Sequence, residues 1–150
     1  MPAKQRIKWI MQGGLVVDLP MIAATDLSAS GVGRFVSSGS IEGEVILATG
    51  ASLPVPLGVL QNSPTAGQPA RVRIFGVSTL TACPAACRLI PGTFITAGSI
   101  GAACAAGALG IVLGRWLSAS VSASTTTGCA FLNCAGFPFF GSTCVPGSTS

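Results

Sequence analysis

The clearest pattern in the chain is an alternation of apolar and charged residues over positions 70–77. Val72 and Ile74 are separated by one residue, and so are Arg71 and Arg73. Successive side chains of a strand point to opposite faces, so the two apolar residues share one face and the two arginines the other. This pattern predicts a half-buried β-strand.

Shorter apolar runs recur along the rest of the chain, each closed by glycine, proline or other turn-forming residues. Short runs of this kind, without a helical stripe, are typical of strands in a small β-barrel or sandwich. Only residues 102–108, which are rich in alanine, could form a helical turn instead. The expected strands are 15–17 and 21–22 around Pro20, then 34–36, 44–49, 56–61, 93–96, 111–117 and 129–132, with a turn at 26–28.

A chain of 150 residues has the length of one domain, since domains usually contain about 100–150 residues. The basic segment 1–14 predicts an extended N-terminal arm. A β-rich domain is expected over residues 15–134, and a tail that contains phenylalanine and cysteine follows at 135–150. The predicted fold is therefore mainly β, with an arm and a tail outside the barrel or sandwich.

Charge is scarce and unevenly distributed. Charged residues make up 8% of the chain, against about 25% in ordinary domains, and no side-chain carboxylate follows Glu44. The chain contains no histidine and no tyrosine. General acid–base catalysis and Ser–His–Asp or Cys–His sites depend chiefly on these residue types. The sequence therefore predicts a protein that is not an enzyme and holds no cofactor.

The apolar and basic character of the chain could also suit a membrane protein or a nucleic-acid-binding protein, but the sequence disfavours both. The uncharged stretch 89–114 is long enough to span a bilayer, but Pro91 and many glycine and polar residues divide it into short apolar islands. A signal peptide is disfavoured because Asp18 and Pro20 interrupt the N-terminal apolar run. Cations beyond the arm are scattered singly, whereas nucleic-acid sites cluster them with stacking aromatics. We expect neither a membrane nor a nucleic acid as partner.

The two ends of the chain offer candidate contact residues. The cations of the arm either meet an acidic protein surface, with tryptophan as an apolar anchor, or stay solvated. The aromatic residues of the tail either fold over the chain's own core or contact a neighbouring subunit, since exposed aromatic clusters rarely stay in water. These candidates are Lys4, Arg6, Lys8 and Trp9 in the arm, and Phe137, Phe139 and Phe140 in the tail.

Six cysteines, all in the second half of the chain, are candidates for disulfide bonds: Cys83, Cys87, Cys104, Cys129, Cys134 and Cys144. Zinc sites usually contain Cys-x2-Cys pairs or histidines. Neither is present here, so disulfides are favoured over a metal, with buried free thiols as the alternative. The sequence leaves the pairing open. Such bridges would stabilise a core built of small residues and would imply an oxidising setting for the mature protein.

The segment over residues 56–80 reads PLGVLQNSPTAGQPARVRIFGVSTL, which is a strand, a Pro/Gly loop and a second strand. Together with residues 26–36 upstream and residues 91–96 and 110–115 downstream, it resembles the phage head decoration, or capsid cement, proteins. The resemblance covers roughly residues 22–132. Two features depart from that family's pattern: segment 83–88 is an insertion, and the tail is extra.

The resemblance implies a β-tulip-like barrel, a homotrimer and a place on the outer surface of the virion. There the protein would bind the major capsid protein and stabilise the expanded shell by bridging its subunits, after synthesis in the host cytoplasm. The four arm residues then become capsid-contact candidates and the three tail phenylalanines become inter-subunit candidates. The alternative is a disulfide-stapled secreted or surface β-protein without enzymatic activity.

Overall fold

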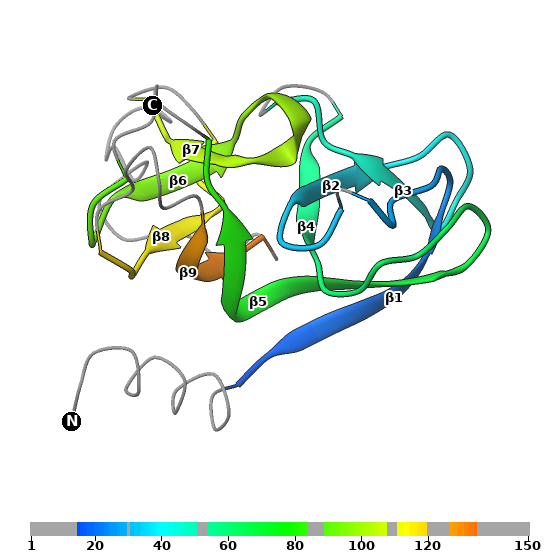
Figure 1. The fold of residues 1–150 in the computed structure, drawn as a ribbon, viewed down its shortest axis with the longest axis horizontal. Coiled ribbons are helices and arrows are strands. Elements are labelled where there is room, and N and C mark those ends of the chain that lie inside the picture. Colours follow the sequence, from blue (N-terminus) through cyan, green and yellow to red (C-terminus); the bar gives the residue numbers. More distant parts are fainter. Residues whose placement is uncertain are drawn as a thin grey trace, which may run out of the picture.

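The fold consists almost entirely of β-strands (Figure 1). It is seen in a computed structural model that describes residues 15–29, 31–50, 54–83, 89–107, 111–119 and 127–134. The described strands form one sheet in the order β1-β3-β2-β4-β5-β9-β8-β6-β7. The elements are β1 (Val17–Ala23), β2 (Phe35–Ser38), β3 (Glu44–Leu47), β4 (Pro56–Leu60), β5 (Pro69–Thr81), β6 (Phe94–Ala97), the 3-10 turn η1 (Ser99–Gly101), β7 (Ala103–Ala105), β8 (Gly114–Trp116) and β9 (Thr127–Asn133).

The first five strands close into a barrel. β1 pairs with β5 in antiparallel orientation and with β3 in parallel orientation at Ile22 and Ala23. Antiparallel pairings then join β3 to β2, β2 to β4, and β4 to β5. The ring β1-β3-β2-β4-β5 therefore returns to its first strand, which confirms the prediction of a mainly β fold with a small barrel.

Pro20 lies within β1, where the sequence predicted two short strands on either side of it. Ala23 N donates to Gln68 O just before β5, whereas Ile22 N donates to Gly43 O just before β3. Alternate backbone nitrogens of a strand point to opposite sides, so the nitrogen of Pro20 points away from β5. β3 pairs with β1 only from Ile22 onward. The missing N–H of Pro20 therefore removes no hydrogen bond from the sheet.

β5 is shared between the barrel and the rest of this sheet, strands β9, β8, β6 and β7, which we call the second sheet. Its residues 69–75 pair with β1 or β4, whereas residues 75–81 pair with β9. Gly76 lies at the changeover with a φ of +107°, which favours glycine because L side chains rarely adopt it. Figure 1 shows β5 running from beside β1 toward β9. A parallel bridge between Ala82 and Ala103 links β7 back to the end of β5.

Two clusters of buried side chains form the core. One fills the barrel, and the other lies between the barrel wall and the second sheet. Neighbouring residues of β2 belong to different clusters: Val36 packs in the barrel cluster and Phe35 packs in the other. Val59 and Leu60 of β4 divide in the same way. A strand that buries both faces needs consecutive apolar residues, so these runs do not alternate with polar residues.

The second half of the chain corrects one expectation. Residues 103–105 form β7, which pairs with β6 across Ile95, Thr96 and Ala97, so no helical turn forms there. Pairing with a neighbouring strand overrides the helix propensity of alanine. The described part of the uncharged stretch 89–114 forms β6, η1, β7 and the start of β8. No helix in the described ranges has the length and apolar character needed to cross a membrane. The predicted arm (1–14) and tail (135–150) lie outside the described residues.

Replacing Gly76 with alanine is expected to lower the free energy of unfolding by roughly 1–3 kcal/mol, because the positive φ strains any side chain. The added Cβ would also lie 2.5 Å from the Leu15 carbonyl oxygen. Gly67→Ala is the matched control, since Gly67 has a φ of +81° and no heavy atom within 4 Å of its Cβ position. Urea unfolding measures both variants. Equal losses would contradict the close packing of the β1 entry against this bend.

Candidate interaction surface

Arg73 makes the most extensive polar contacts of the barrel wall. Its Nε donates to Asp18 Oδ1 at 2.8 Å and its Nη2 donates to Asp18 Oδ2 at 3.1 Å, so the two side chains form a paired, charge-assisted contact. Its Nη1 donates to the Val77 carbonyl oxygen at 2.9 Å. The Arg73 side chain is only 13% exposed and that of Asp18 20%. Arg73 therefore fastens β1 to β5 and spans the bend at Gly76.

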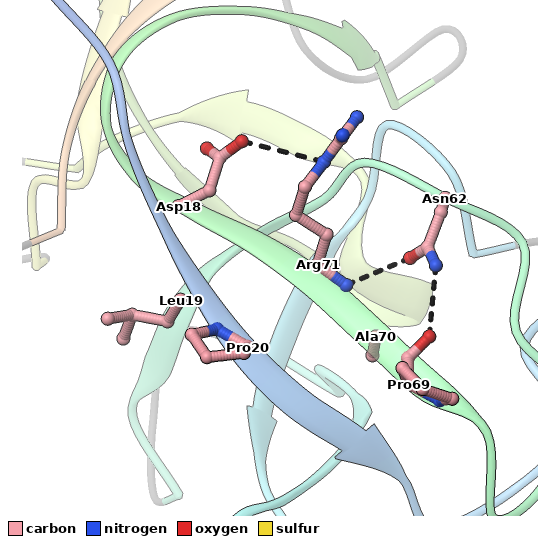
Figure 2. Close-up of a pocket in the computed structure, with 7 residues that line it drawn as sticks. All are labelled: Asp18, Leu19, Pro20, Asn62, Pro69, Ala70 and Arg71. Atoms are coloured by element: carbon pink, nitrogen blue, oxygen red, sulfur yellow. Dashed lines mark hydrogen bonds and ion pairs between the residues drawn. The ribbon is translucent and has the colours of Figure 1, made fainter.

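Arg71 lies on the same face of β5 but extends into solvent. Its Nε is 3.5 Å from Asp18 Oδ2, and its side chain is 60% exposed. Figure 2 shows Asn62 beside it, where Arg71 N donates to Asn62 Oδ1 and Asn62 Nδ2 donates to Pro69 O. Asn62 therefore fixes the loop that leads into β5, and the Arg71 guanidinium remains available to a partner.

A shallow, mostly apolar hollow lies beside this pair of strands (Figure 2). It measures about 300 Å³ and opens to solvent. Its lining comes from one side of β1 and from both ends of the loop before β5: Asp18, Leu19, Pro20, Asn62, Pro69, Ala70 and Arg71. The hollow can receive an apolar side chain, with the Arg71 guanidinium at its rim for a carboxylate or carbonyl oxygen.

The chain enters β1 through exposed apolar residues. Leu15 is 73% exposed, and Val16 and Val17 are also exposed. These residues follow the predicted arm directly, and Leu15 and Val16 lie over the glycine at the β5 bend. The entry strip, residues 15–17, and the hollow are two of the exposed apolar areas, and both lie along β1. Exposed apolar groups gathered in this way mark contact sites more often than single exposed residues do.

A second, polar hollow of about 230 Å³ is lined by residues of the segment between β1 and β2 together with Ser63 and Thr81. Arg34 is among its lining residues, and its Nη1 donates to the Ile100 carbonyl oxygen at 3.0 Å. Ile100 has a φ of +57°, a costly conformation for a β-branched residue, and its side chain is exposed. Nearby, hydrogen bonds from Ser28 hold the pKa of the Asp26 carboxyl below its usual range. The 26–28 turn predicted from the sequence is therefore present.

Cys83 and Cys134 carry free thiols in the structure. The candidates Cys87 and Cys144 lie outside the described residues, and disulfide bonds in this chain therefore remain a prediction. Burial raises the pKa of the Cys134 thiol to about 12, and its Sγ donates to the Leu113 carbonyl oxygen at 3.6 Å. Cys129 Sγ lies 3.9 Å from Thr79 Oγ1. Within the described ranges, no three His, Cys, Asp or Glu side chains gather as metal ligands. Cys134 acts as a small apolar residue that packs against the cluster between the barrel wall and the second sheet.

All contact candidates predicted from the sequence fall outside the described residues: Lys4, Arg6, Lys8, Trp9, Phe137, Phe139 and Phe140. The disulfide candidates Cys87 and Cys144 also fall outside them. Sequence reasoning missed the role of Asp18, which lies opposite Arg73 in the sheet. The alternation at 70–77 placed both arginines on one face, but nothing in the sequence indicated that a carboxylate 55 residues away would meet them.

Known proteins match this chain through the fold and not through the sequence, since neither a protein-family model nor a curated protein matches it. The head fiber gp8.5 N base in bacteriophage phi29 matches with a TM-score of 0.58 and 13% identity, covering 83% of this chain and 100% of that one. A chain from the capsid of Myoviridae phage XM1 matches with a TM-score of 0.56 and 17% identity, covering 81% of this chain and 86% of that one. The predicted resemblance to phage head proteins is confirmed at the level of the fold.

Replacing Arg73 with lysine is expected to lower the free energy of unfolding by roughly 1–3 kcal/mol, because an ammonium cannot reproduce the paired contact with Asp18. Arg71→Lys is the control, with an expected change below about 1 kcal/mol for an exposed ion pair. Chemical denaturation of both variants measures the difference. A loss at Arg71 as large as that at Arg73 would contradict the role assigned to the paired contact.

The raised pKa of Cys134 predicts a stability loss at alkaline pH. The folded protein keeps the thiol proton until about pH 12, whereas the unfolded chain releases it near 9.0. The unfolded state then binds fewer protons, so the free energy of unfolding falls as pH rises between these two values. Cys134→Ser should remove this part of the pH dependence, as followed by urea unfolding across the range. An unchanged slope would contradict the burial of the thiol.

Proposed function

We propose that this chain is a structural virion protein that binds the outer surface of a phage capsid. In this role it stabilises the expanded shell by bridging neighbouring major capsid protein subunits. The observation that carries the proposal is the fold match, which covers the whole of the phi29 head fiber base chain and 83% of this one. The second match, to a chain of a phage capsid, supports the same association.

The chemistry of the chain supports a binding role without catalysis. Histidine and tyrosine are absent, and no side-chain carboxylate follows Glu44. What the described surface offers is contact area: the entry strip, the hollow beside β1 and the exposed Arg71. Many modest contacts repeated over a symmetric shell add through multivalency, so no single interface has to be strong.

In this proposal the arm makes the first contact with the capsid. Lys4, Arg6 and Lys8 pair with carboxylates of the major capsid protein, and Trp9 anchors the segment in an apolar pocket. The entry strip at residues 15–17 continues the same contact onto the barrel, because its apolar side chains are exposed where the arm joins β1. In a homotrimer, Phe137, Phe139 and Phe140 contact a neighbouring subunit.

Two experiments test the proposal: detection of the chain in purified virions, and binding of the purified protein to shells assembled without it. Mass spectrometry of purified particles should find the chain after its synthesis in the host cytoplasm. Purified protein should also bind saturably to expanded shells assembled without it. Deleting residues 1–14 should weaken this binding about tenfold or more, and replacing Lys4, Arg6 and Lys8 with glutamine should give part of that loss.

The control for the arm is Ala66→Glu, which changes charge at an exposed loop position away from the entry strip and should leave shell binding unchanged. Recovery of the chain only in secreted or membrane fractions, with no binding to shells, would overturn the proposal. Full binding by the deleted form would overturn the role of the arm.

A further inference from the structure

The outer face formed by β6 and β8 carries a cation among apolar side chains. Arg115 lies opposite Phe94 in the sheet, and its guanidinium carbon is 5.1 Å from the centre of the Phe94 ring. Its Nε donates to the Gly92 carbonyl oxygen at 3.1 Å. Ile90 and Leu117 are exposed on either side of this pair in the sequence. We refer to Ile90, Phe94, Arg115 and Leu117 as the receiving face.

The receiving face is held in place before any partner binds. Gly92 N donates to Trp116 O, and Trp116 N donates back to Thr93 O, both at 2.8 Å. Trp116 is fully buried between Arg115 and Leu117, so the alternation of the strand turns these two neighbours outward. A cation stacked on an aromatic ring within a fixed apolar frame is typical of the residues that dominate binding at interfaces.

Arg115 finds no carboxylate in its own half of the molecule. No side-chain carboxylate follows Glu44 in the sequence, and the ion pairs among the described residues involve only Asp18 with Arg71 and Arg73. The carboxylates of the chain belong to the part that builds β1, β2 and β3. Among the described residues Arg115 therefore forms no ion pair, and its guanidinium can take a carboxylate from a second molecule while Nε stays bonded to Gly92 O.

The β2–β3 turn offers the complementary chemistry. Ile41 is 65% exposed and Glu42 is exposed next to it. The turn is closed by Gly39 N donating to Glu44 O at 2.8 Å and by Glu44 N donating to Ile41 O at 3.1 Å. It therefore projects one apolar and one acidic side chain from a fixed backbone. Figure 1 places β2 and β3 at one end of the long axis, and β6 and β8 at the other.

We propose that the β2–β3 turn of one protomer docks on the receiving face of a second copy, with Glu42 pairing with Arg115 and Ile41 packing against Phe94, Ile90 and Leu117. Two different patches at opposite ends make a head-to-tail contact, which closes into a ring when the rotation between copies permits it. The inference gives residues to the homotrimer of the proposed function and rests on that part of it alone.

The test uses purified full-length protein and light scattering during size-exclusion chromatography over a dilution series. Arg115→Glu and Glu42→Arg should each raise the dissociation constant of the oligomer about tenfold or more, because like charges then face each other. The double variant Glu42→Arg, Arg115→Glu should restore assembly, since the pair is reversed and not removed. Ala66→Glu is the surface control and should assemble as the unmodified protein does.

A fold defect in the Arg115 variant is separated from an interface defect by Ile41→Asp, which alters only an exposed turn residue and should weaken assembly to a similar degree. An unmodified protein that is monomeric at every concentration would overturn the inference, even where it still binds shells. Failure of the double variant to recover assembly would overturn the pairing of Glu42 with Arg115. Assembly without any binding to shells would leave this interface standing and refute only the capsid role.

Discussion

The contact between Arg73 and Asp18 is the interaction on which the rest of the structure depends. One guanidinium holds the carboxylate of β1 through two hydrogen bonds and the Val77 carbonyl through a third. The first two hydrogen bonds join β1 to β5, the strand pair that closes the barrel. The third spans Gly76, where β5 leaves the barrel for the second sheet. Charge-assisted bonds of this kind fix geometry as well as energy, so barrel closure and the course of β5 are set by the same side chain.

The scarcity of large side chains follows from how closely the strands approach one another. A Cβ on Gly58 of β4 would lie 2.4 Å from the Arg73 carbonyl oxygen on the neighbouring strand. β2 and β4 also serve both cores, with Phe35 and Val59 on one side and Val36 and Leu60 on the other. Consecutive apolar residues on these two strands allow two cores to share one wall, while Gly58 lets β4 approach β5 closely.

The local structure could be predicted from the sequence, whereas the long-range closure could not. Alternation at 70–77 and the short apolar runs located most strands, because side-chain period and turn residues are local properties. The pairing of β1 with both β3 and β5 depends on residues far apart, and the burial of Arg73 follows only from that pairing. β7 was missed because Ala103 and Ala105 have no strand preference of their own. The contact candidates that the sequence predicts lie at the two ends of the chain, whereas the exposure of Arg71 and Arg115 depends on neighbours that are distant in the sequence.

The course of β5 also determines when this protein can fold during synthesis. β1 precedes the other described strands in the chain, yet its antiparallel partner is β5, and β5 in turn pairs with β9, the last strand described. Pairings of such long sequence separation form slowly, because loop closure costs entropy before any contact repays it. A nascent chain that ends before residue 69 holds four barrel strands without the strand that closes them. Folding of both sheets is therefore expected to complete only after β9 has been made.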